Sequence, residues 1–142
     1  MKLTGITAEQ VAATTLSASI STHLLLCEES LQLILKAGFP YDGVTIQADP
    51  IAQQNANGYL TALQSGVPVP FPIEWRTKEN TSYLIPDLDA FRLLAAAMLS
   101  FVQQVFHSTW NVKDAIREAA TPAEIATLYD TYRTTWGLLP QS

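Results

Sequence analysis

The chain has 142 residues, of which 48% are hydrophobic and 15% charged, with a formal net charge of -5 and a pI of about 4.8. This length suits one domain with a self-sufficient core, and the eight scattered basic residues disfavour nucleic-acid binding, which requires clustered cations against the phosphates. The single cysteine excludes an intramolecular disulfide and a multi-cysteine metal site.

The first predicted element is one long helix over residues 7–37. Thr7 and Gln10 have the spacing of a capping box at its start, and Gly38 is a typical residue just past a helix end. Serine and threonine are frequent in the first half, so we expect a break near residues 17–22. The second half carries a wide apolar face, which must be buried against another part of the protein.

A short hairpin and a second helix are predicted next. Residues 42–43 read Asp-Gly, a strong signal for a tight turn, and residues 44–47 alternate as a half-buried strand does. Asp49 is placed to cap the following helix, with Pro50 at its first position. This helix is expected to end at about residue 66.

A second hairpin follows a proline-rich connector. Residues 67–72 contain three prolines in six positions and are predicted to be rigid and extended. IEWRT then reads as a strand, KENT as a turn and SYLI as the return strand. The alternation places Trp75 and Thr77 on one face, with Arg76 and Lys78 on the opposite face.

The remaining predicted elements are helices at about 87–108, 111–119 and 121–134, the first with apolar residues recurring every three or four positions. The predicted order is therefore α-ββ-α-ββ-ααα, a helix-rich α+β fold in which helices pack on two short β-hairpins. We expect two domains: an N-terminal helical arm at 1–37, and a compact α+β domain at 38–142.

Residues that could perform chemistry are few. Cys27 and His23 are four residues apart on one predicted helix, so they share a face, as a nucleophile and its base would. The alternative is that Cys27 is a small core residue. A metal site needs at least three converging ligands, and no ligand motif occurs among the two histidines and the acids. We therefore predict no catalytic residue, metal or cofactor, and no enzyme.

The compartment is predicted from the same composition. The N-terminus lacks the apolar stretch of a signal peptide, and the single cysteine fits a reducing environment. The apolar windows at 33–36 and 93–102 are shorter than the ~18 to 20 residues of a membrane helix, so no membrane is expected and the protein is predicted to be soluble. Charge is scarcer than the ~25% of ordinary globular proteins, which favours partner subunits or further copies of the chain covering part of the surface.

Four motifs in this sequence belong together in one family pattern. They are Gly43-Val44 with Asp49, the run Trp75–Asn80, the run Phe101–Phe106, and Ala115-Ile116 with Ala119-Ala120-Thr121. Through them, residues 24–127 resemble the domain of unknown function at the C-terminal end of many bacteriophage tail-fibre assembly proteins.

The resemblance implies a phage protein that acts as a chaperone for the tail-fibre protein, aiding its folding and trimerisation and either leaving or staying bound. The alternative is a structural component of the phage tail or baseplate. The expected location is the host cytoplasm during infection, or the virion tail. Fibre tips expose unpaired strand edges before assembly, and such edges aggregate unless a strand or an apolar helix face covers them.

The residues expected to bind this partner lie in the second hairpin. They are Trp75, Arg76, Tyr83 and Lys78, because Trp, Arg and Tyr dominate interface energetics. The alternative for Trp75 is a core residue beneath the third helix. Both interpretations are compatible, since Arg76 and Lys78 point away from the face that carries Trp75.

Overall fold

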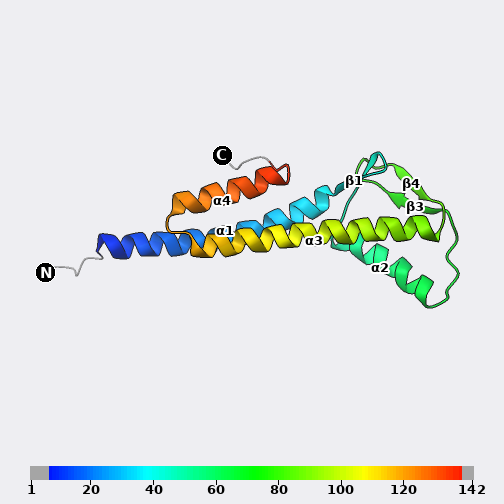
Figure 1. Ribbon diagram of the computed structural model, residues 1–142, viewed down its shortest axis with the longest axis horizontal. Coiled ribbons are helices and arrows are strands. Elements are labelled where there is room, and N and C mark those ends of the chain that lie inside the picture. Colours follow the sequence, from blue (N-terminus) through cyan, green and yellow to red (C-terminus); the bar gives the residue numbers. More distant parts are fainter. Residues whose placement is uncertain (1–6, 139–142) are drawn as a thin grey trace. The chain divides into compact units, whose positions relative to one another are not determined.

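The computed structural model describes residues 7–138, in which four helices and two separate two-stranded antiparallel sheets occur (Figure 1). In chain order these are α1 (Ala8–Ala37), β1 (Phe39–Tyr41), β2 (Val44–Ile46), α2 (Pro50–Gln64), β3 (Ile73–Arg76), β4 (Ser82–Ile85), α3 (Leu88–Glu118) and α4 (Pro122–Thr135). The α+β class and the position of the hairpins among the helices are confirmed. Residues 1–6 and 139–142, which the predicted arm and domain included, lie outside the described residues.

The first helix begins with the predicted capping box. The Thr7 amide donates to Gln10 Oε1 at 2.8 Å, and the Gln10 amide donates to Thr7 Oγ1 at 3.1 Å. The expected break near residues 17–22 is wrong, because α1 is continuous. Each serine or threonine costs only some tenths of a kcal/mol in a helix, and no glycine or proline is present there to interrupt it.

The helices expected at 87–108 and 111–119 form the single helix α3. No glycine or proline separates them. Thr109, at the expected junction, is 1% exposed, and its hydroxyl lies 2.6 Å from the Tyr132 hydroxyl. Packing of this position against α4 therefore favours an uninterrupted helix.

Because α3 is continuous, it is the one helix among the described residues that is long and apolar enough to cross a membrane by length and composition alone. The two short apolar windows in the sequence did not indicate this length. The same properties are typical of the core helix of a soluble protein. Phe91, Leu94 and Met98 on one face of α3 are buried at 0 to 3% exposure, whereas only 28% of its most apolar 18-residue window is buried.

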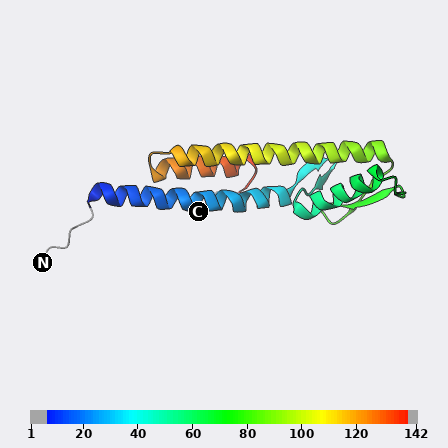
Figure 2. The same cartoon turned by 90° about the horizontal axis from the view of Figure 1, so that it is seen from below.

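The described residues divide into two compact units, and the first joins α1 up to Leu31 to the chain from His107 onward. Ser30 Oγ lies 3.0 Å from the Tyr129 hydroxyl, and Arg133 Nη1 donates to Ser30 Oγ at 2.9 Å. The first part of α1 therefore shares a buried polar network with α4. Figure 2 shows α4 running back along the end of α3. The expected boundary between residues 37 and 38 does not coincide with this division.

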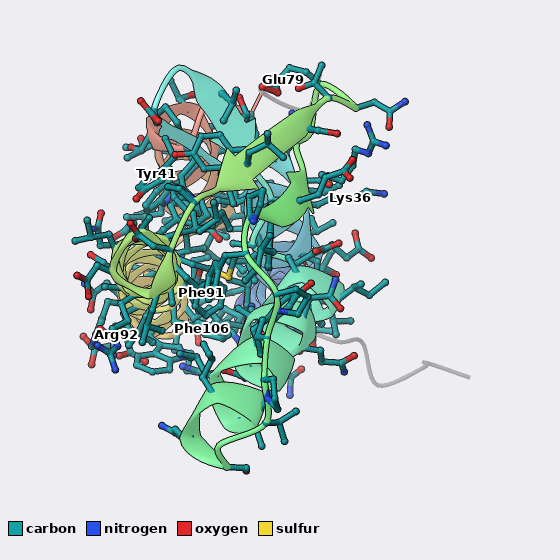
Figure 3. All side chains as sticks on the ribbon, turned by 90° about the vertical axis from the view of Figure 1, so that its right-hand side faces the viewer. Lys36, Tyr41, Glu79, Phe91, Arg92 and Phe106 are labelled. Carbon is teal, nitrogen blue, oxygen red and sulfur yellow. The ribbon has the colours of Figure 1, made fainter. Side chains whose placement is uncertain are left out.

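The second unit covers Gln32–Phe106 and contains both hairpins, α2 and the first part of α3. Its core side chains come from all of these elements, and Figure 3 shows Phe91 among them, whereas Arg92 lies at the periphery. Phe39 of β1 lies against Phe101 of α3, with ring centroids 5.1 Å apart. Tyr59 of α2 contacts Phe91 of α3 at 5.6 Å.

Candidate functional site

The turn of the second hairpin fixes the register of its strands. The Thr77 amide donates to the Thr81 carbonyl at 2.9 Å, and the Asn80 amide donates to the Thr77 carbonyl at 3.0 Å. Asn80 has a φ of 63°, the left-handed conformation that asparagine tolerates better than most residues. This turn aligns Trp75 with Tyr83 across the two strands.

The register determines which backbone groups of β3 face outward. Residues in an antiparallel pair alternate between positions that bond to the partner strand and positions whose N–H and C=O groups point away from it. Since Thr77 bonds to the opposite strand, Trp75 does so too, and Glu74 and Arg76 point their backbone groups away from β4. No other described strand pairs with β3, so these two residues form an open edge.

A cleft of about 950 Å³ borders this open edge. It is lined by α2 and the residues just before it, by the proline-rich connector that returns from α2 to β3 (Figure 1), and by β3 itself. The lining residues from β3 are Glu74, Trp75 and Arg76, and none comes from β4. The open edge of β3 therefore lies on a concave surface rather than on a flat one.

Two aromatic rings line the cleft, those of Tyr59 and Trp75, with centroids 6.3 Å apart. Trp75 is 7% exposed, and its indole N–H donates to no described group. Because no side-chain nitrogen or oxygen among the described residues is buried without a partner, this N–H keeps access to solvent. The cleft thus combines two aromatic rings with polar side chains, among them Gln54, Asn55 and Arg76.

The predicted partner-binding residues take different places. Arg76 is exposed on the outer face of β3, where Nη1 donates to the Asn80 carbonyl at 3.1 Å. Trp75 is buried, which favours its interpretation as a core residue that shows one edge in the cleft. Lys78 and Tyr83 do not line the cleft.

Lys78 and Tyr83 instead connect the second hairpin to the first. The Lys78 amide donates to the Thr45 carbonyl at 2.9 Å. The Tyr83 hydroxyl donates to Asp42 Oδ2 at 2.8 Å, and this hydrogen bond to a carboxylate raises the pKa of Tyr83 to about 12. The Thr45 amide donates to Glu79 Oε1, so both outward backbone groups of Thr45 are satisfied by the second hairpin. These contacts hold the open edge in place.

Several lining residues were not found from the sequence, above all Gly58 and Tyr59 of α2 and Pro68 of the connector. The connector itself gave a usable signal, because three prolines in six residues make a stiff segment that can form one wall. Gly58 and Tyr59 of α2 gave no such signal, since an exposed glycine and a tyrosine in a helix do not indicate which part of the protein lies opposite them.

Cys27 and His23 lie in the other unit and do not form a nucleophile pair in the arrangement observed. Cys27 is 0% exposed, and burial raises the pKa of its thiol to about 11. His23 Nδ1 lies 2.8 Å from the Ser19 carbonyl, to which it donates, and its ring meets the edge of Tyr129. Among residues 7–138, no group of three His, Cys, Asp or Glu side chains is placed to hold a metal ion.

The buried thiol leads to a prediction about alkaline pH. Because folding raises the pKa of the Cys27 thiol, the buried neutral thiol stabilises the fold fully below about pH 9, the ordinary pKa of cysteine. This stabilisation is lost as the pH rises through about 11, the pKa in the folded chain. We expect the native chain to resist iodoacetamide at neutral pH, and Cys27→Ala to lose less stability than the parent between these pH values. Urea unfolding at each pH measures this. Rapid alkylation of the folded chain would contradict the burial argument.

Comparison with protein families matches residues 29–131 to a domain of unknown function, DUF4376. No curated protein and no solved structure matches the chain. The family match covers both hairpins, the cleft and most of the helices. Because it spans well over half of the sequence, the chain belongs to the DUF4376 family of domains of unknown function.

Proposed function

We propose that the chain is a tail-fibre assembly chaperone, a non-enzymatic protein that binds the phage tail-fibre protein and aids its folding and trimerisation. The observation that carries this proposal is the open edge of β3 inside a cleft. A fibre subunit that has not yet trimerised exposes strand edges and apolar faces, which aggregate when left uncovered. An open edge on a concave surface is suited to cover such a segment temporarily.

The identity of the client comes from the resemblance of residues 24–127 to the domain found in tail-fibre assembly proteins. The low content of charged residues, 15%, is compatible with a surface partly covered by a partner. Arg76 at the cleft is of a residue type enriched in interfaces, and Trp75 supplies the edge of its ring. No cofactor or nucleic acid enters this proposal.

Co-expression with the tail-fibre protein of the same phage tests the proposal. We expect soluble fibre trimer with the chain and aggregated fibre without it. Gly58→Leu should abolish this effect, because Gly58 lines the cleft and has open space where a side chain would begin. Leucine is a better helix former than glycine, so the variant should remain folded, as circular dichroism would show.

Two outcomes would contradict the proposal. One is a fibre that forms soluble trimer equally well alone. The other is a stoichiometric band of the chain in purified virions together with no effect on fibre solubility, which would favour the structural tail or baseplate component instead. The Gly58→Leu variant tests the role of the cleft only if the parent chain increases the yield of soluble fibre trimer, because only then can that increase be lost.

A further inference from the structure

We propose that the cleft binds an extended segment of a partner protein by adding it as a third strand to the open edge of β3. The client's identity rests on the function proposed above, whereas the mode of binding rests on the geometry of the edge. Glu74 and Arg76 together present two N–H and two C=O groups outward, enough for a short strand of a partner to pair with.

One end of the open edge is closed, which fixes where an added strand must lie. Lys78 is the next residue along the chain with its amide on the outward side, and that amide is already bonded to the Thr45 carbonyl of β2. An added strand therefore pairs from Arg76 toward Ile73 and cannot continue past Thr77. β2 therefore limits how far along β3 the bound segment can pair, and this limit fixes the register of the bound segment.

The side chains around the edge indicate the chemistry of the bound segment. Glu74 and Arg76 are both exposed and lie two residues apart, hence on the same face of β3. Cross-strand neighbours of opposite charge stabilise a sheet. We therefore expect a cation opposite Glu74 and a carboxylate opposite Arg76, two residues apart in the bound segment.

The alternate positions of the bound segment point to the other face, toward the side on which Trp75 is buried and Tyr59 lies beside it. Apolar side chains fit there, because they cover the exposed ring edge and the connector wall at Pro68. The occupant is thus a segment that alternates apolar residues with an acidic and a basic residue. It lacks proline where its amides must pair with the edge.

A second copy of the chain is a poorer occupant than a partner's segment. The β3 edge of a second copy lies within the same concave surface, bounded by α2 and the connector. To pair, the two edges would have to bring the α2 and connector walls of both copies past each other. A flexible segment of a partner enters the cleft without this restriction.

The experiment uses a displayed library of random peptides of about ten residues, selected on the immobilised full-length chain. We expect enriched peptides to alternate apolar and polar residues and to carry opposite charges two positions apart. Methylation of a pairing amide in an enriched peptide should weaken binding to the unaltered chain by about tenfold, the value of one lost hydrogen bond.

Two proline variants locate the binding edge on the protein. Glu74→Pro removes an outward amide from β3 and should weaken peptide binding by about tenfold or more. Leu84 lies directly opposite Glu74, so Leu84→Pro removes the equivalent outward amide from β4, outside the cleft, and should leave binding unchanged. The two variants lose the same kind of group from opposite edges of one hairpin.

The proposal is overturned if no peptide is enriched, if methylated and unmethylated peptides bind alike, or if only Leu84→Pro weakens binding. A concentration-dependent dimer that Glu74→Pro abolishes would replace the partner by a second copy. Failure of the two proposals can be told apart. If Glu74→Pro assists fibre folding as well as the parent, strand addition fails, whereas edge-dependent peptide binding without any effect on the fibre refutes the chaperone function alone.

Discussion

Replacing Gly38 by alanine is expected to lower the free energy of unfolding by about 3 kcal/mol. Gly38 follows α1 with a φ of +81°, and a Cβ atom built there would lie 2.2 Å from the Ile46 carbonyl oxygen. The neighbouring atom is backbone of β2, held in register with Phe39, so it cannot move aside as a side-chain end would. The cost combines a left-handed backbone with a steric overlap.

Gly43→Ala is the matched control for this change. Gly43 has nearly the same φ, +80°, but nothing lies within 4 Å of an added Cβ. It should therefore show only the conformational cost, about 1 kcal/mol. Urea unfolding of both variants measures the difference. Equal losses would mean that the close approach of Gly38 to β2 does not contribute to stability.

Trp75→Ala is the second change with a large expected effect, a loss of about 3 to 4 kcal/mol in the free energy of unfolding. The ring is 7% exposed and contacts Tyr59, which in turn contacts Phe91. Truncation would remove the aromatic contact between β3 and α2. Leu84→Ala, on the neighbouring strand at 58% exposure, should change stability by less than about 0.5 kcal/mol.

This pair of variants distinguishes the two interpretations of Trp75. A core residue loses stability on truncation, whether or not a client is present. If Trp75→Ala unfolds at the same urea concentration as the parent but no longer captures client, the side chain is an interface anchor and its burial in the free chain is not what stabilises the fold.

Local signals in the sequence predicted most of the secondary structure. Asp49 caps α2 as expected, its Oδ1 accepting from the Ala52 amide at 3.1 Å. The tight turn at Asp42 and Gly43, both with positive φ, forms the first hairpin. Such signals act over three or four residues, so they need no knowledge of the rest of the chain. They failed at the junction predicted before residue 111, because packing of Thr109 against α4 keeps the helix continuous there.

The division into units could not be predicted in the same way. Ser30 and Tyr129 are 99 residues apart in sequence, yet their hydroxyl groups share a buried hydrogen bond. Neither residue has a neighbour in sequence that indicates the other. Local signals therefore predict the helical arm at 1–37 as a separate part, although Ser30 within it belongs to the same compact unit as α4.

The candidate site was predicted in part. Alternation along β3 correctly placed Trp75 and Arg76 on opposite faces, as their burial shows. The direction of the backbone groups at Glu74 follows from the register, which the turn at Thr77 sets. The cleft depends on α2 and the connector lying beside β3, and alternation within one strand carries no information about what lies at its edge.

Residue-resolved hydrogen exchange at Glu74 and Arg76, with and without the tail-fibre protein, tests the central claim most directly. In the free chain their outward amides should exchange quickly, whereas those of Trp75 and Thr77, bonded within the hairpin, should be protected. In the complex, we expect protection of Glu74 and Arg76 to rise markedly. A complex that forms while both amides exchange as fast as in the free chain would contradict binding at the β3 edge.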